Sequence, residues 1–367
     1  MDKNFFMGIA AMAALTLVSC SSDDLNSLSD NSSKNEAISF DSYLGRSAVA
    51  VNGSRSIMLN DKESLQGLEA GFGVFGNYSS ATENNGFGSN LFDNQQVTYK
   101  TSAWTYSPLK YWPTQGHIDF LAYAPYVKTP NFNGSSIDFT VENKVADQKD
   151  LLYAKADGQT MTNNSGDNKV KFQFAHALSR LGYSVKLKEK CSSDATITLK
   201  KITLAGSAPE PTTGTTTESA KAFYTNGTID LSTGIWEKHS AGAGKQDFIN
   251  WFSGTQDVTS ASESKPYKNP TSDYLFVIPQ NFSEKIEDAG LQKENPDKLY
   301  VIVEYDIHYK DIDKTITNKV YKQLTQEFEQ GKAYTINLTI GLTPIEFDVT
   351  TVEGWTDINQ VEINSWN

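Results

Sequence analysis

The sequence predicts an all-β protein made of antiparallel β-sandwiches. In residues 299–309 and 334–342 every second residue is apolar, and the same alternation recurs at 172–174 and 183–187. A period of two with one polar face is typical of half-buried antiparallel strands. Helical patterns are rare, and stretches rich in Ser, Thr, Asn, Gly and Pro separate the apolar segments.

Three short segments carry more specific predictions. Ala175–Leu181 and Thr325–Gly331 are each predicted to form one or two helical turns. Asn226-Gly227 lies in the middle of Tyr224–Ile229 and predicts a tight β-hairpin, because Asn-Gly supplies the positive φ angles of a type I′ turn.

The first twenty residues are typical of an export signal. A short charged start precedes an apolar run over residues 5–18, which is shorter than the roughly 20 residues that span a bilayer. Leu17-Val18-Ser19-Cys20 resembles the bacterial lipobox, in which the cysteine is acylated and begins the mature chain. We expect residues 1–19 to be removed and Cys20 to be lipidated; the alternative is an ordinary signal peptide that contains a cysteine.

Residues 20–35 predict a flexible tether after the lipid. Ser21 to Lys34 contains six Ser, three Asp and two Asn, and so buries too little apolar surface to offset its chain entropy. Ser22-Asp23-Asp24 resembles the acidic tag that directs some lipoproteins of Gram-negative bacteria to the outer face of the outer membrane. We therefore expect display at the cell surface, with the membrane contacted only through the lipid.

The mature chain is long enough for two domains with separate cores. A polar break at 162–169 divides it into an N-terminal domain, 36–165, and a C-terminal domain, 166–367. The low-complexity stretches 207–219 and 253–270 are predicted to be surface loops.

Composition excludes several classes of partner and site. The net charge of −12 argues against binding to nucleic acid or to an anionic membrane surface. With Cys20 assigned to the lipid, Cys191 is alone, so the sequence predicts neither an internal disulfide nor a zinc site.

No group of residues suggests catalysis or a cofactor. Gly71-Phe72-Gly73-Val74-Phe75-Gly76 matches the dinucleotide-binding pattern in letters, but no strand-to-helix transition follows it, so a glycine-containing β-strand is the better interpretation. The histidines at 117, 176, 239 and 308 are scattered, without ligand partners at helical or hairpin spacing. We expect no enzymatic activity, no cofactor and no metal.

The densest group of aromatic residues surrounds Trp104 and Trp112. Such rings could form a glycan-binding platform. The alternative is packing in the sheet core, which the interleaved prolines and the strand-like periodicity favour.

At these residues the chain resembles the fimbrillin family, the lipoprotein pilins and adhesin-like proteins of Gram-negative anaerobes, of the fimbrillin A and Mfa-like kind. The resemblance rests on four blocks in order: Trp104–Pro113, Ile118–Pro125, Phe174–Leu181, and Tyr334–Leu338 continuing to Val352–Trp355. It implies two tandem transthyretin-like β-sandwich domains, the second beginning near Phe174. It also implies cleavage after an arginine by a trypsin-like protease, loss of the first strand, and filling of the opened groove by the C-terminal strand of a neighbouring subunit.

The chain has residues for the first part of this implied mechanism. Ile38, Phe40 and Tyr43 mark a segment with strand-like alternation, which would be the removable strand. Arg46 follows it directly and is the first candidate for cleavage, with Arg55 the second. The alternative is two ordinary loop arginines.

For the second part, residues 356–367 extend beyond the last block. Val361, Ile363 and Trp366 are the candidate anchors of a donated strand; pairing within its own domain, or a frayed terminus, is the alternative. The resemblance implies partners among other fimbrial subunits, identical or related, and location in the outer membrane or fimbrium. Whether the chain is a stalk, anchor or tip subunit stays open, as does a host or bacterial surface glycan or protein as its adhesion ligand.

Overall fold

The computed structural model describes most of the chain between residues 36 and 352. The described residues are 36–44, 59, 61–80, 87, 91–188, 194–206, 223–237, 245–246, 248–270, 273–282, 298–341 and 346–352. Residues 35–367 form one compact unit.

The regular secondary structure of the described residues is almost entirely β-strand, which confirms the prediction of an all-β protein. They contain one short α-helix, α1 (Lys62–Gln66), and one 3-10 helix, η1 (Val145–Asp147). Neither of these helices is long and apolar enough to cross a membrane.

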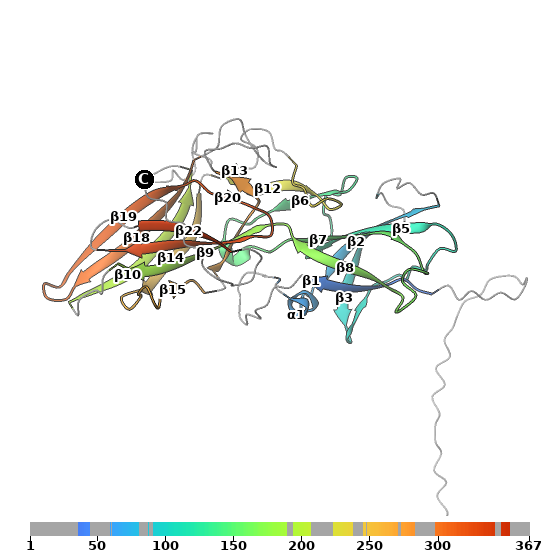
Figure 1. Ribbon diagram of the computed structural model, residues 1–367, viewed down its shortest axis with the longest axis horizontal. Helices are drawn as coiled ribbons and strands as arrows, with labels where there is room; N and C mark the ends of the chain where they lie inside the picture. Colours follow the sequence, from blue (N-terminus) through green and yellow to red (C-terminus); the bar gives the residue numbers. More distant parts are fainter. Residues whose placement is uncertain are drawn as a thin grey trace, which may run out of the picture. The chain divides into compact units, whose positions relative to one another are not determined.

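The first sheet has seven strands and is drawn in blue to green in Figure 1. Across the sheet the strands are β1 (Ser39–Leu44), β8 (Lys169–His176), β7 (Leu152–Gln159), β5 (His117–Ala124), β2 (Phe72–Ser79), β3 (Phe92–Lys100) and β4 (Ala103–Thr105). The end strands β1 and β4 contact each other, so the sheet curves around its core.

Two further sheets lie in the second half of the described chain. One consists of β14 (Phe248–Asp257), β10 (Ala195–Ala205), β18 (Leu299–Tyr309) and β19 (Lys314–Leu324). The other consists of β15 (Tyr267–Lys268), β9 (Ser179–Leu187), β21 (Ala333–Ile340) and β22 (Glu346–Val352), with β16 (Leu275–Val277) also paired to β9.

Three two-stranded pairs complete the described structure. They are β6 (Ser136–Thr140) with β12 (Asn226–Asp230), β11 (Phe223–Tyr224) with β13 (Lys245–Gln246), and β17 (Gln280–Asn281) with β20 (Glu327–Phe328). Strand β8 begins beyond the predicted boundary at 165/166 yet pairs within the first sheet, and β12 pairs with β6. Backbone pairing therefore joins both sides of that boundary, and the two-domain division stays a prediction.

The predicted alternation is confirmed in the long strands. Along β18, Leu299, Val301, Val303, Tyr305 and Ile307 are buried, as expected for a strand with one face in the core. Two pairings, β1 with β8 and β9 with β21, are parallel, whereas the sequence predicted antiparallel sheets. A period of two describes the faces of a strand and does not distinguish these directions.

Three local predictions are wrong, and the predicted surface loop 253–270 contains the end of β14 and all of β15. Ala175–Leu181 is divided between the strands β8 and β9, and Thr325–Gly331 contains β20, so neither forms the expected helical turns. Asn226-Gly227 lies inside β12, paired with Thr140 and Phe139, instead of forming a hairpin turn. Pairing with distant strands overrides the local preference in each case.

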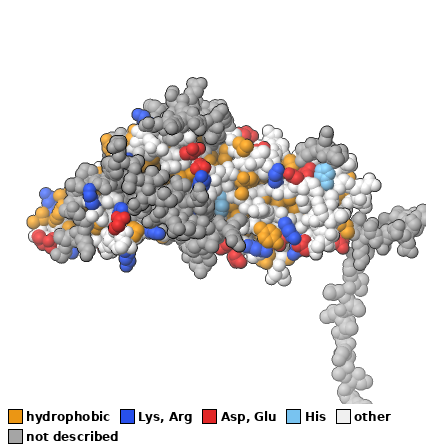
Figure 2. All heavy atoms as spheres, in the orientation of Figure 1, with side chains coloured by type: hydrophobic (Ala, Val, Ile, Leu, Met, Phe, Trp, Pro, Cys, Tyr) orange, Lys and Arg blue, Asp and Glu red, His pale blue; other side chains and the backbone are white. Residues whose placement is uncertain are grey.

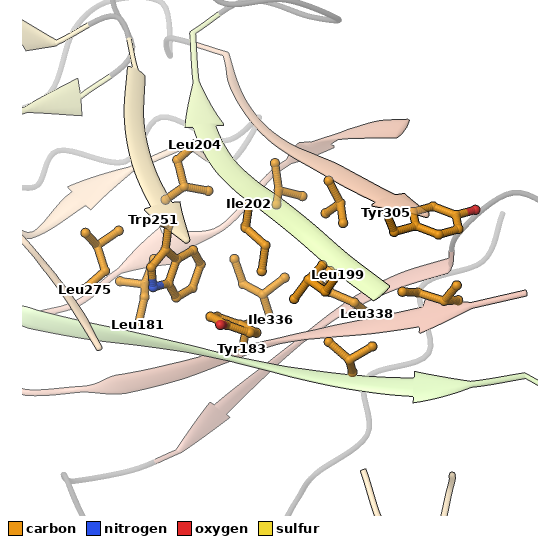
Figure 3. Packing of buried hydrophobic residues seen from close by; sticks show 14 of the residues in the cluster. Leu181, Tyr183, Leu199, Ile202, Leu204, Trp251, Leu275, Tyr305, Ile336 and Leu338 are labelled. Atoms are coloured by element: carbon orange, nitrogen blue, oxygen red, sulfur yellow. The ribbon is translucent and has the colours of Figure 1, made fainter. Parts of the chain in front are cut away.

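The sheets of the second half pack face to face around an aliphatic core. Figure 3 shows Leu199, Ile202 and Leu204 of β10 facing Leu181 and Tyr183 of β9, with Ile336 and Leu338 of β21. The seven-stranded sheet encloses a separate core in which eight of the twenty buried residues are aromatic. A third cluster covers the other face of β2 and β5, so these central strands are buried on both faces.

The glycines of the dinucleotide-like pattern lie in a β-strand, as the sequence analysis favoured. Gly73 and Gly76 belong to β2, where the chain packs closely against rings of the neighbouring strands. A Cβ added at Gly73 would lie 2.4 Å from Cε1 of Tyr123, and one at Gly76 2.8 Å from Cδ2 of Phe92. The pattern therefore reflects packing of the backbone against aromatic side chains.

His176, at the end of β8, lies beside the carboxyl of Asp150. Nδ1 of His176 is 2.8 Å from Oδ2 of Asp150, whose carboxyl is fully buried. Burial raises the pKa of the Asp150 carboxyl, and the adjacent His176 ring opposes the rise. The sequence analysis found no partner for His176, because residues 26 positions apart come together only through the fold.

On the face drawn in Figure 2, acidic and basic side chains are interspersed, and apolar side chains are scattered between them. The described residues drawn on that face form no continuous basic area for a polyanion.

We predict that Gly73→Ala lowers the free energy of unfolding by about 1–3 kcal/mol, because the added methyl group overlaps the Tyr123 ring. Gly166→Ala is the control, since a Cβ there meets nothing within 4 Å. Urea unfolding of both variants measures the difference. Equal stability of the two variants would contradict the close packing of β2.

Candidate functional site: the first strand and its groove

The candidate site is β1 together with the groove that it fills. β1 lies at the edge of the seven-stranded sheet. Among the described strands it pairs with β8 alone, from Ser39 opposite Lys169 to Leu44 opposite Phe174. The pairing is parallel. An edge strand can leave by breaking one ladder of hydrogen bonds, whereas a central strand would have to break two.

The residues before β1 are held from the other side. The amide of Ile38 donates to the Lys110 carbonyl at 2.8 Å, and the amide of Trp112 donates to the Glu36 carbonyl at 3.2 Å. The Tyr106 hydroxyl donates to the Ile38 carbonyl at 2.7 Å. The segment therefore enters the sheet between β8 and residues 106–112.

Phe40 is the principal contact between β1 and the core. Its ring is 2% exposed and lies among five aromatic rings. Centroid distances are 6.4 Å to Phe72, 5.6 Å to Phe92, 5.4 Å to Tyr106, 5.7 Å to Phe120 and 5.6 Å to Phe172. Loss of β1 would expose these rings to water, at a cost proportional to the apolar area uncovered.

Alternate residues of the segment point into the groove. Ile38, Phe40 and Ser42 are buried, and the Ser42 hydroxyl has no hydrogen-bond partner among the described residues. Tyr43 lies on the opposite face with 44% of its surface exposed, so it does not anchor the strand in the core. Its position follows from the strand period, because residues 40 and 43 have opposite parity.

The outer face of β1 is held by α1. Nζ of Lys62 lies 3.3 Å from Oδ1 of Asp41 and 5.2 Å from the centre of the Tyr43 ring. The helix begins in a capping box, in which the Ser64 amide donates to the Asp61 carboxylate at 2.7 Å. These polar contacts are partly exposed and therefore contribute little energy beside Phe40, though they orient the strand.

The candidate cleavage residues Arg46 and Arg55 lie outside the described residues. Leu44, the last residue of β1, and Leu59 both belong to the same core as Phe40. The chain between residues 44 and 59 thus begins and ends at this core.

The donor anchors Val361, Ile363 and Trp366 also lie outside the described residues. The last described strand, β22, pairs with β21 and ends at Val352. Fifteen residues follow Val352 to the end of the sequence at Asn367.

Trp104 and Trp112 are core residues. They are 7% and 3% exposed, and the ring of Trp104 lies 4.7 Å from that of Phe72. A glycan-binding platform requires rings that face solvent, and these two indoles are buried.

Among the described residues, no His, Cys, Asp or Glu side chains gather in a way that could hold a metal ion. The sequence pattern predicted the strand around Phe40 but not the contacts that attach its outer face to α1. No local pattern indicates the contacts of Lys62, because its partners Asp41 and Tyr43 lie about twenty positions earlier in the sequence.

Three comparisons with known proteins each find a similarity to fimbrillin-like or fimbrial proteins. The sequence model of the family described as "Fimbrillin-like" matches residues 66–355. The chain is 27% identical over 399 residues to the fimbrium subunit Fim1C of Phocaeicola vulgatus, covering 97% of this chain and 98% of that protein. It is also similar in structure to a fimbrial protein from Bacteroides vulgatus, with a TM-score of 0.65 and 23% identity over 87% of this chain and 99% of that one.

We predict that Phe40→Ala lowers the free energy of unfolding by about 3–5 kcal/mol, because it leaves a cavity among five rings. Tyr43→Ala, on the exposed face of the same strand, should cost about 1 kcal/mol or less. Denaturant unfolding of both variants measures the contrast. Similar losses would show that Phe40 is not the main attachment of β1.

Proposed function

The chain belongs to the fimbrillin-like family and is a non-enzymatic fimbrial subunit, and we propose that it polymerises by exchange of β1 for the terminal strand of a neighbour. In this proposal the chain is exported as a lipoprotein acylated at Cys20 and anchored in the outer membrane. Cleavage after Arg46, or after Arg55, then frees β1.

The observation that carries this proposal is the placement of β1. It is a strand of six residues with a single β-partner, yet its Phe40 is central to the core of the first sheet. An empty groove would expose both apolar rings and the unpaired backbone groups of β8. An added strand would cover the rings and form hydrogen bonds with the backbone groups of β8. This is the physical basis of recognition by β-augmentation.

Two of the three hydrophobic clusters support the accompanying proposal of two tandem sandwiches of the transthyretin-like kind. One core is enclosed by the seven-stranded sheet and the other by the four- and five-stranded sheets. In a fibre each subunit would receive a strand in its first sandwich and donate one from beyond its second. The stalk, anchor and tip roles differ in which of these steps they use, and adhesion to a surface glycan or protein would be a property of the assembled fibre.

We predict that limited digestion of residues 21–367 with an Arg-specific protease removes the segment through Arg46 and starts polymerisation. Residues 35–367 form a compact unit, so this chain retains the whole fold. Mass spectrometry and negative-stain microscopy follow the reaction. Arg46→Gln should block both events and Arg55→Gln neither, if Arg46 is the site. A digested chain that has lost β1 but stays monomeric would contradict the proposal.

We predict that deletion of residues 361–367 abolishes polymerisation and leaves a folded monomer. The described strands all end at or before Val352, so the deletion leaves them intact. Size-exclusion chromatography of the digested variant, with circular dichroism as the folding control, measures the outcome. If the variant forms fibres as well as the full chain does, donation of residues 361–367 to a neighbouring subunit is excluded.

A further inference from the structure

We propose that residues 361–367 repeat the side-chain pattern of residues 38–44, the segment that contains β1, and that they occupy the emptied groove of a second copy of the chain in one register. In that register Val361 takes the place of Ile38, and the strand runs parallel to β8. This inference rests on the proposed strand exchange and specifies which residues replace which.

The two segments match position by position. Residues 38–44 read Ile-Ser-Phe-Asp-Ser-Tyr-Leu, and residues 361–367 read Val-Glu-Ile-Asn-Ser-Trp-Asn. Six of the seven positions keep their character: apolar, polar, apolar, Asp or Asn, Ser, and aromatic. Only the last differs, with Leu44 replaced by Asn367, where the groove leaves the side chain half-buried.

The inward positions fit the groove. Ile38, Phe40 and Ser42 point inward in β1, and the tail offers Val361, Ile363 and Ser365 at the same places. Ser42 is fully buried, so its site admits a small side chain. Ser365 is the residue of the tail that meets this condition.

The outward positions fit the contacts made by α1. Lys62 binds the Asp41 carboxylate and the face of the Tyr43 ring. In the proposed register it meets the amide oxygen of Asn364 and the indole of Trp366. Because indole is the strongest of the aromatic partners for a cation, Trp366 would serve as an outer contact with Lys62 and not as a core anchor.

Other registers bury the wrong side chains. A shift of one residue would turn Glu362 and Asn364 into the core, because successive side chains of a strand face opposite ways. A shift of two residues would place either Ile363 at the Ser42 site or Ser365 among the rings around Phe40. In the reverse direction, Val361 would meet the small Ser42 site.

The difference in size at the central position explains why cleavage must come first. Ile363 is smaller than Phe40 and fills less of the space among the five rings. The tethered β1 therefore excludes the tail for two reasons: its attachment gives it a high effective concentration, and its ring packs more completely. Ile363→Phe should accordingly strengthen assembly of the cleaved chain.

The register is tested by disulfide trapping in the Cys191→Ser form of residues 21–367. Asp41 lies opposite Lys171, so Asn364→Cys and Lys171→Cys should form a disulfide between subunits after Arg-specific digestion. Lys169→Cys, opposite Ser39, replaces Lys171→Cys in the control. Both lysines are exposed, so the folded monomer should tolerate either change.

A covalent ladder from the Lys171 pair, and none from the Lys169 pair, is the expected result on a non-reducing gel. Fibres that trap only the Lys169 pair, or neither, would overturn the register and leave strand exchange standing. A disulfide within one chain would overturn assignment to a second copy. If the Cys191→Ser chain without further cysteines loses β1 and forms no fibres, strand exchange itself is refuted, and the proposed register with it.

Discussion

The first half of the fold depends on burial of one side chain by an edge strand. Phe40 inserts into a cage of aromatic rings, and β1 closes the curved seven-stranded sheet around them. The strand gives the core much of its central packing but adds only one ladder of backbone pairing. Large apolar burial combined with a single ladder of pairing to β8 is the combination that the proposed exchange of β1 requires.

The central strands show the contrast. β2 and β5 are buried on both faces and paired on both edges, with Gly73 packed directly against Tyr123. Removing such a strand would disrupt two clusters and two ladders together. The strand that we propose to exchange thus lies at the edge of its sheet and near the start of the described region, where its release would disturb the fewest contacts.

Sequence alone predicted the faces of the strands and not their partners. Alternation identified β18 and the segment around Phe40, because side-chain parity is a local property. The parallel pairing of β1 with β8, and the pairing of Asn226-Gly227 with β6 as part of β12, depend on residues far away in the sequence. The outward position of Tyr43 could have been predicted, since it follows from the parity of Phe40.

The most direct test is the N-terminal residue of this subunit in fimbriae purified from the producing cell. Intact mass analysis of the dissociated subunits determines it. Exchange of β1 predicts a chain that begins at Ser47, directly after Arg46, or at Ser56 if Arg55 is cut, and that lacks residues 36–44. Polymerised subunits that still carry these residues would contradict the replacement of β1 by a neighbour's strand.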